Sequence, residues 1–315
     1  MIYMERKIKK LSIVIPVYYN ELNLCSLYDD LKEKVFNRIN YDYELVFVDD
    51  GSKDSSWDII NKLKKKDNNI LAIRLSRNFG SHAAILCGIS NCSGDCVIVK
   101  SADLQEPSEI IHNMVSEWEL GANVVLAVRN SREERWIQSF FANLYYDITR
   151  KLALHEMPRG GFDVYLVDRK VIDVLARLDE TNSALTGQIL WSGFRTKHIY
   201  YNRLAREKGQ SRWTMRKKIK LVADTLFSFS VFPIKVVSGV GFGSVVGAII
   251  WAVVELALKL EGKIEIQGWT MLFVFCLFAF GTIMFTLGIL GNYIWRIFDA
   301  SRNRPPYIVE DFVKW

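Results

Sequence analysis

Cysteine and histidine are scarce in this chain, and neither is arranged as a metal site. The 315 residues include five cysteines and four histidines. No two cysteines form a Cys-x-x-Cys pair, and the histidines are scattered, which argues against a histidine-based zinc centre. An odd set of unpaired cysteines favours small core residues in a reducing compartment.

The glycine-rich loops that usually cradle phosphate are also absent. Neither Gly-x-Gly-x-x-Gly nor Gly-x-x-x-x-Gly-Lys-Ser occurs, so metal and basic side chains would have to neutralise a bound nucleotide's phosphates. No nucleic-acid-binding motif is present. The net charge of +6 comes partly from Met215–Lys220 and Arg296–Arg304, beside apolar segments, which favours a membrane surface over nucleic acid as partner. No cleavable signal peptide is expected, because the charged N-terminus leads directly into a strand.

Strand-like and helix-like segments alternate through the first part of the chain. Helical spacing is clearest from Leu22 to about Val35. Such alternation with short loops predicts an α/β fold with a mostly parallel, doubly wound sheet. The expected strands are 11–17, 43–48, 70–75, 97–99, 123–128 and 164–167.

The loop after the fourth expected strand carries the main chemical signal. Ser101-Ala-Asp-Leu-Gln-Glu-Pro107 follows this strand, and Pro107 is expected in the first turn of a helix. Ligands of open α/β sheets bind beyond the carboxyl ends of the strands. Asp103 and Gln105 are two residues apart, so their oxygens can converge on Mg²⁺ or Mn²⁺ shared with a diphosphate. The alternative is a solvated loop that caps the helix.

Polar residues follow the other strands at the same edge. Asp49 and Asp50 are adjacent carboxylates suited to a nucleotide's base or ribose, although Asp-Gly is also a common turn. Arg129 is a candidate for phosphate, because the planar guanidinium suits phosphate. Asp163 could orient a substrate or cap a turn. The remaining candidate loops and arginines are Tyr18–Glu21, Ser76–Gly80, Arg206 and Arg212.

Two long uncharged segments lie near the C-terminus. Residues 236–254 and 266–295 each approach or exceed the roughly 20 apolar residues that cross a bilayer. Buried helices of a soluble core are the alternative. The short segment 255–265 between them predicts a hairpin. Glycines at positions 239, 241, 243 and 247 would allow close helix approach, and with it homo-oligomerisation.

The basic residues predict an orientation. A dense run, Met215–Lys220, precedes the hairpin, and arginines follow it, whereas its loop has only Lys259 and Lys263. The positive-inside rule then places both termini in the cytoplasm. The predicted parts are a catalytic domain (1–215), an interfacial helix (216–232), two transmembrane helices (about 235–258 and 268–295, within 233–298) and a cytoplasmic tail (299–315).

Four segments, in this order, resemble the glycosyltransferase family 2 enzymes with a GT-A fold. The resemblance is closer to the polyprenyl-phosphate sugar transferases, of the bactoprenol glucosyltransferase and dolichyl-phosphate mannose synthase type, and runs from about Leu11 to Trp213. The segments are Ile15-Pro-Val-Tyr-Tyr-Asn-Glu21, Val48-Asp-Asp-Gly-Ser52, Ala102-Asp-Leu-Gln-Glu-Pro107 and Arg206-Glu-Lys-Gly-Gln-Ser-Arg-Trp213.

This resemblance implies a role for each matching residue. Asp103 and Arg129 would act in catalysis, and Asp103 with Gln105 would hold the metal; Asp163 is added to the catalytic candidates from its position in the turn before a strand. Phosphate would be contacted by Arg129, Arg206 and Arg212. The nucleotide pocket would comprise Pro16, Tyr18, Glu21, Asp49, Asp50, Ser101, Ala102 and Asp103.

Two positions depart from the family's pattern. Ser101 stands where the family usually has the first acid of Asp-x-Asp. Tyr18 and Tyr19 stand where many relatives have one tyrosine, so either could stack on the base.

The activity implied is inverting transfer of a single sugar from a nucleotide sugar to undecaprenyl phosphate. The product would serve cell-envelope glycan modification at the bacterial inner (cytoplasmic) membrane. UDP-glucose is the first expectation for the donor, ahead of other UDP-hexoses and GDP-mannose. One alternative is a processive polysaccharide synthase, although Gln210-Ser-Arg-Trp213 is one residue short of its Gln-x-x-Arg-Trp motif. The other is a non-catalytic membrane scaffold, suggested by Ser101.

Overall fold

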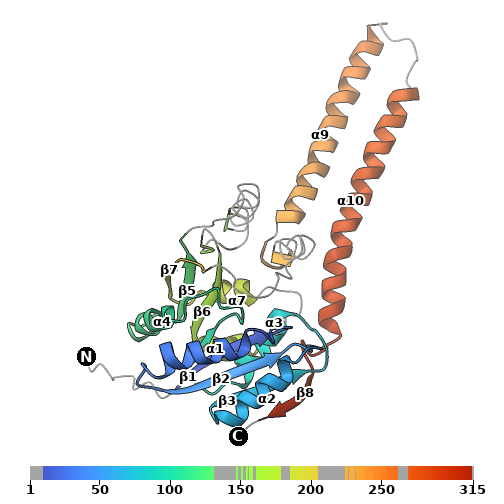
Figure 1. The fold of residues 1–315 in the computed structure, drawn as a ribbon. Coiled ribbons are helices and arrows are strands. Elements are labelled where there is room, and N and C mark those ends of the chain that lie inside the picture. Colours follow the sequence, from blue (N-terminus) through green and yellow to red (C-terminus); the bar gives the residue numbers. More distant parts are fainter. Residues whose placement is uncertain are drawn as a thin grey trace. The chain divides into compact units, whose positions relative to one another are not determined.

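The structure is a computed structural model in which the chain divides into two compact units (Figure 1). One comprises Met1–Thr225 with Pro305–Trp315, and the other Leu226–Arg304. The structure describes residues 10–130, 147, 150–151, 154, 156–158, 161–178, 185–204, 224–225, 227–230, 232–261 and 269–313.

An eight-stranded sheet forms the centre of the first unit. Its strand order is β7-β5-β6-β4-β1-β2-β3-β8. The β4–β1, β1–β2, β2–β3 and β5–β7 pairs are parallel, so the expected mostly parallel α/β sheet is confirmed. The strands are β1 (Lys10–Val17), β2 (Asp42–Asp49), β3 (Ile70–Leu75), β4 (Cys96–Val99), β5 (Val124–Arg129), β6 (Phe162–Asp168), β7 (Thr196–Tyr201) and β8 (Val309–Val313).

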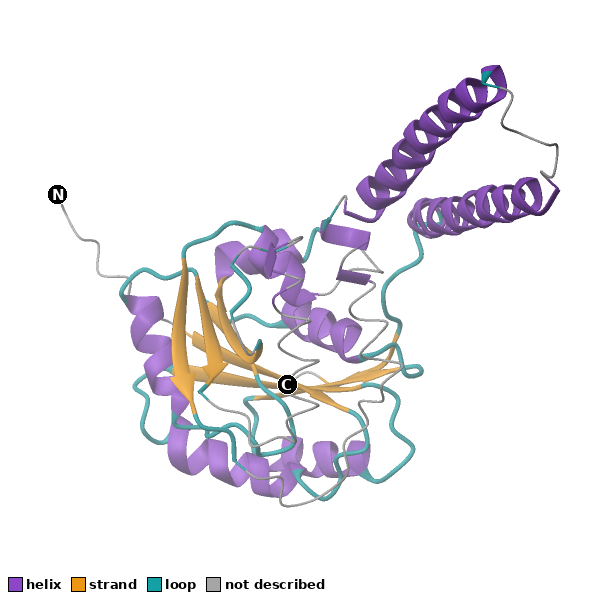
Figure 2. Ribbon diagram, turned by 90° about the horizontal axis from the view of Figure 1, so that it is seen from above, coloured by secondary structure: helices purple, strands orange, loops and turns teal. Residues whose placement is uncertain are grey.

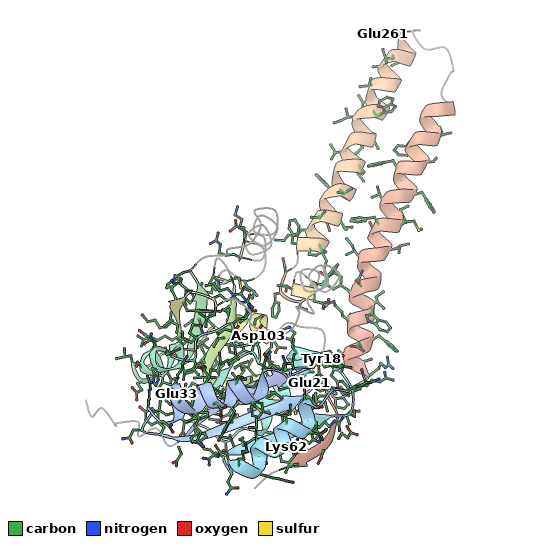
Figure 3. All side chains as sticks on the ribbon, viewed as in Figure 1. Tyr18, Glu21, Glu33, Lys62, Asp103 and Glu261 are labelled. Atoms are coloured by element: carbon green, nitrogen blue, oxygen red, sulfur yellow. The ribbon has the colours of Figure 1, made fainter. Side chains whose placement is uncertain are left out.

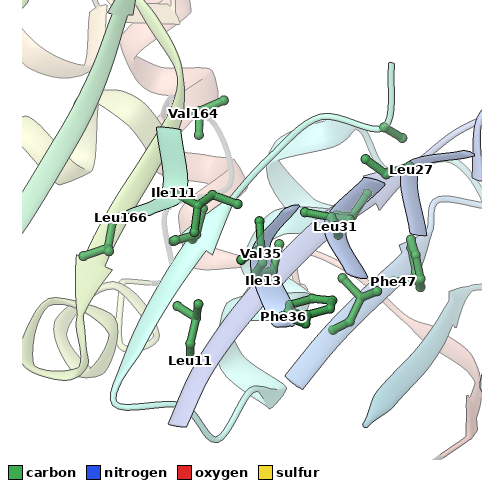
Figure 4. Packing of buried hydrophobic residues seen from close by; sticks show 14 of the residues in the cluster. Leu11, Ile13, Leu27, Leu31, Val35, Phe36, Phe47, Ile111, Val164 and Leu166 are labelled. Carbon is green, nitrogen blue, oxygen red and sulfur yellow. The ribbon is translucent and has the colours of Figure 1, made fainter. Parts of the chain in front are cut away.

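Helices cover both faces of this sheet (Figure 2). The expected helix after β1 forms as α1 and continues as a π-helical turn, η1; its apolar residues Leu27, Leu31 and Val35 pack in one cluster with Ile13 and Phe47 of the sheet (Figure 4). Burying this apolar stripe stabilises the helix. The helices are α1 (Leu24–Leu31), η1 (Lys32–Phe36), α2 (Ser56–Lys66), α3 (Ser81–Asn91), α4 (Ile110–Glu119), α6 (Arg169–Leu175) and α7 (Leu185–Trp191).

Two strands depart from a simple parallel order. β6 was expected as a strand, and it runs antiparallel between β4 and β5. Its first residue, Phe162, pairs with Val128 near the end of β5. The chain therefore re-enters the sheet beside the carboxyl end of β5, and β6 runs in the opposite direction to β5. β8 lies in the segment expected to be a tail, and pairs antiparallel with the outer strand β3.

The helix after the 101–107 loop begins later than expected. Pro107 lies in a turn, where its carbonyl accepts a hydrogen bond from the Ile110 amide at 3.3 Å, and α4 starts at Ile110. The proline therefore precedes the helix instead of forming its first turn.

The second unit contains two long helices, α9 (Phe232–Leu260) and α10 (Trp269–Ser301). By length and composition each could cross a bilayer, with windows at Phe232–Trp251 and Phe278–Ser301. Neither window is buried inside the protein, unlike the core helix of a soluble domain. Of the expected interfacial helix, only 224–225, 227–230 and 232 are described; the basic run Met215–Lys220 lies outside the described residues.

Candidate active site

Polar loops follow the parallel strands β1, β2 and β4 at one edge of the sheet. Val17 pairs with Asp49, so β1 and β2 end together, and β4 ends slightly earlier on the same side of the sheet, where Val99 pairs with Val14. Figure 3 labels Tyr18, Glu21 and Asp103 in this region. The edge predicted from the sequence to carry the site therefore gathers these loops.

The β1–α1 loop is held against the start of α2. The Tyr19 amide donates to the Ser52 hydroxyl at 3.0 Å, and the Ser55 amide donates to Glu21 at 2.9 Å. Tyr19 has a positive φ of 56°, and its ring meets the Tyr18 ring edge-on at 4.6 Å between centroids. Both tyrosines remain candidates for stacking on a base.

Asp50 acts as an anchor for the loop that precedes α3. Its two carboxylate oxygens accept the backbone amides of Phe79 and Gly80 at 2.7 and 2.9 Å. Burial raises the pKa of Asp50 above its ordinary value. Asp50, itself a predicted base- or ribose-binding residue, therefore uses both of its oxygens to hold this loop.

Asp49 is also buried, and burial raises its pKa. One of its oxygens accepts the Ser52 amide at 3.1 Å, while the other lies 3.6 Å from Nε of Arg74. Arg74 lies at the same distance from Glu310 of β8. Asp49 thus stabilises the turn at 50–52 and attracts the guanidinium of Arg74 on the neighbouring strand β3.

Gly51 sits between this pair and Arg77, and no larger residue fits there. Its φ is +68°, and a Cβ would lie 2.6 Å from the Arg77 carbonyl carbon. We expect Gly51→Ala to lower the free energy of unfolding by about 2–3 kcal/mol through backbone strain and this clash. Gly193 is a matched control, because it has the same φ of +68° and a Cβ there would meet no atom of the described residues within 4 Å.

Thermal unfolding of the full chain in detergent measures both variants. Gly193→Ala should show only the strain, roughly 1 kcal/mol. Equal losses in the two variants would mean that contact with Arg77 has no energetic weight.

Hydrogen bonds fold the 101–106 loop into a compact turn. The Ser101 hydroxyl lies 2.7 Å from Oδ1 of Asp103 and 2.5 Å from Oε2 of Glu106. The Gln105 amide donates to the same Asp103 oxygen at 3.2 Å. Leu104 between them has a positive φ of 59°, an uncommon conformation for leucine. Ser101 thus contacts the carboxylates of Asp103 and Glu106, and does not itself provide a carboxylate for a metal.

Arg203, which sequence reasoning missed, binds both predicted metal ligands. Its Nη2 donates to Oε1 of Gln105 at 2.6 Å and lies 3.9 Å from Oδ2 of Asp103. The Leu204 amide donates to the Gln105 carbonyl at 2.9 Å, which fixes the end of β7 on the loop. The available signal was a basic residue two positions after Thr196–Tyr201, a segment that forms β7 but was not among the expected strands.

These contacts test whether the loop suits a divalent cation. Asp103 and Gln105 already turn their oxygens to one positive group, so the residues fit Mg²⁺ or Mn²⁺. Over the described ranges no cluster of three or more His, Cys, Asp or Glu residues could hold a metal. Water and substrate phosphate would therefore have to complete the coordination.

A buried lysine, Lys100, is bonded to Glu106 of the 101–106 loop. The Lys100 ammonium donates to the Glu106 carbonyl and lies 3.8 Å from its carboxylate, and both side chains are almost fully buried. Burial lowers the pKa of Lys100. Since Glu106 also contacts Ser101, the pair connects the sheet interior to the loop.

Arg129 and Asp163 form an ion pair between the end of β5 and the start of β6. Arg129 is nearly buried, whereas Asp163 is exposed. Asp163 therefore orients the arginine.

Tyr201, at the end of β7, is buried, and burial raises the pKa of its hydroxyl. Arg206 and Arg212 lie outside the described residues, so their expected phosphate contacts stay predictions.

Comparison with known proteins agrees with this arrangement. The model of the family "Glycosyl transferase family 2" matches residues 12–220. An α/β sheet domain with this match defines a glycosyltransferase of the GT-A fold. The chain belongs to glycosyl transferase family 2.

Two curated relatives and one solved structure illustrate the likeness. The uncharacterized glycosyltransferase YkcC of Bacillus subtilis is 37% identical over 300 residues, covering 95% of this chain and 93% of the relative. The bactoprenol glucosyl transferase of Shigella phage SfV is 32% identical, covering 96% and 98%. Glucosyl-3-phosphoglycerate synthase from Mycobacterium tuberculosis, solved with UDP, has 14% identity and a TM-score of 0.50, covering 70% and 79%.

Proposed function

We propose that this glycosyltransferase moves one sugar from UDP-glucose to undecaprenyl phosphate at the cytoplasmic face of the bacterial inner membrane. The observation that carries the transfer chemistry is the convergence of Asp103, Gln105 and Arg203 at the carboxyl edge of the sheet. The name of the Shigella phage SfV relative, which matches nearly the whole chain, supports the acceptor.

The chemistry proposed requires charge stabilisation more than proton transfer. A lipid phosphate is already anionic at neutral pH, so its oxygen can attack the anomeric carbon without a strong general base. A divalent ion at Asp103 and Gln105 would supply positive charge to the leaving nucleoside diphosphate. Arg129, held by Asp163, would stabilise a second anionic group close by.

A panel of labelled nucleotide sugars, offered to membranes that contain the protein and undecaprenyl phosphate, tests the proposal. We expect UDP-glucose to give a lipid carrying one sugar. A polymer product would favour the processive synthase instead. No labelled lipid with any donor, together with no calorimetric binding of nucleotide sugar in Mg²⁺ or Mn²⁺, would favour the scaffold.

The membrane hairpin and its orientation form part of the proposal. α9 and α10 would cross the bilayer, with 1–215, an interfacial helix at 216–232 and 299–315 on the cytoplasmic side. In α9, a Cβ added at Gly239, Gly241, Gly243 or Gly247 meets no atom of the described residues within 4 Å. Gly239, Gly243 and Gly247 are spaced four residues apart and share one helix face, and this face is where we expect homo-oligomers to form.

Introduced cysteines would report the orientation. Glu261 lies exposed directly after α9, whereas Lys62 lies exposed on α2 (Figure 3). With exposed Cys25 and Cys276 replaced by serine, we expect a membrane-impermeant maleimide to label Glu261→Cys on spheroplasts. Lys62→Cys should react only after permeabilisation. The reverse pattern would contradict the orientation.

A further inference from the structure

Arg203 occupies the position where the proposed metal would bind. Its Nη2 lies 2.6 Å from Gln105 Oε1 and 3.9 Å from Asp103 Oδ2. A Mg²⁺ ion needs its oxygen ligands at about 2.0–2.1 Å. An ion bound by these oxygens would therefore confront the guanidinium at close range, and two positive groups repel. Metal and Arg203 should compete for the same oxygens.

In this position the Arg203 guanidinium still has an N–H group available to donate a hydrogen bond. Among the described residues, neither Nε of Arg203 nor Nε of Arg129, both buried, has a hydrogen-bond acceptor. Buried donors without acceptors are costly, so they point to a missing acceptor. The Tyr201 side chain interacts electrostatically with both arginines. An anion with several oxygens, such as phosphate, could accept from these groups.

We infer that Arg203 holds the metal loop until the divalent ion binds, and that it then moves to a substrate phosphate as a catalytic residue. This inference rests on the proposed function for the identity of that phosphate. The backbone contact between Leu204 and Gln105 keeps the arginine beside the loop, so a side-chain rotation suffices. Arginine suits both positions, because its planar guanidinium donates equally well to carboxylate, amide and phosphate oxygens.

Removal of Arg203 should then change two properties in opposite directions. Without its competitor, the metal should bind tighter, by about tenfold for a typical coupling between two sites. Without its phosphate contact, turnover should fall by about 10²-fold. A purely structural arginine would give weaker metal binding together with lower activity. The opposite signs distinguish the two roles.

Three variants of the full chain in detergent test this. Mn²⁺ binding, followed by electron paramagnetic resonance with and without UDP, is compared with turnover for Arg203→Gln, Arg203→Lys and Arg177→Gln. Arg177→Gln is the control for loss of one charge, because Arg177 lies exposed after α6. Arg203→Lys keeps the charge but loses the fork, so Mn²⁺ affinity should stay near wild type while turnover falls.

The outcomes separate this inference from the proposed function. Unchanged or weaker Mn²⁺ binding in Arg203→Gln overturns the competition. Tighter binding with wild-type turnover overturns the move to phosphate. If the wild-type chain transfers no sugar, the proposed function fails, whereas the Mn²⁺ titration still decides the competition. UDP should tighten Mn²⁺ binding more in the wild type than in Arg203→Gln, because only in the wild type does it also draw a competing arginine away from Asp103 and Gln105.

Discussion

Asp103→Asn should reduce sugar transfer by about 10³-fold, corresponding to a barrier higher by roughly 4 kcal/mol. The amide would keep an oxygen for the Ser101 and Gln105 contacts but lose the charge that attracts the metal. The loop and the sheet below it should therefore fold as before. Labelled lipid formed per minute measures the effect, and Mn²⁺ titration should show weakened binding.

The matched control is Asp173→Asn, the same change at an exposed position of α6. Its turnover and melting temperature should equal those of the wild type. Wild-type-like activity in purified Asp103→Asn would refute the assignment of Asp103 to the metal. An equal loss in both variants would trace the effect to net charge.

Lys100→Met should have the largest effect on stability. Methionine fills a similar volume but leaves the buried Glu106 carboxylate without its cation. Breaking a buried ion pair in this way typically costs about 3–5 kcal/mol. For a domain of this size that loss lowers the melting temperature by roughly 10 °C. Thermal unfolding of the full chain in detergent, followed by intrinsic fluorescence, gives the shift.

The double variant Lys100→Met, Glu106→Leu decides the cause. An apolar pair of similar size can replace a buried ion pair at little cost. The double variant should therefore melt above Lys100→Met. If it melts at or below the single variant, the loss comes from packing of the lysine stem and not from an unpaired charge.

Local pattern was sufficient to predict most of the sheet and the edge that carries the site. The parallel strands and their polar loops follow from residues that are neighbours in sequence. The direction of β6 could not be predicted, because it depends on where the chain returns after β5. β8 was missed for a similar reason: the Val309–Val313 run is too exposed and too short to be distinguished from a tail.

Residues that act through distant contacts were also missed. Arg203 reaches Gln105 across 98 positions, and no local spacing predicts such a contact. Lys100 directly follows the fourth strand, yet only its complete burial shows that it stabilises Glu106. Asp163 lay among the candidates without a partner, and the structure supplies Arg129.

The pairing of β8 with β3 makes the hairpin an insertion within one folded domain. Residues 305–315 return to the unit that the first 225 residues build. Ending the chain before them would strip β3 of its neighbour and leave a row of unsatisfied amides and carbonyls that invites self-association. A water-soluble form is therefore better obtained by excising 226–304 and splicing the flanks with a flexible linker than by truncation.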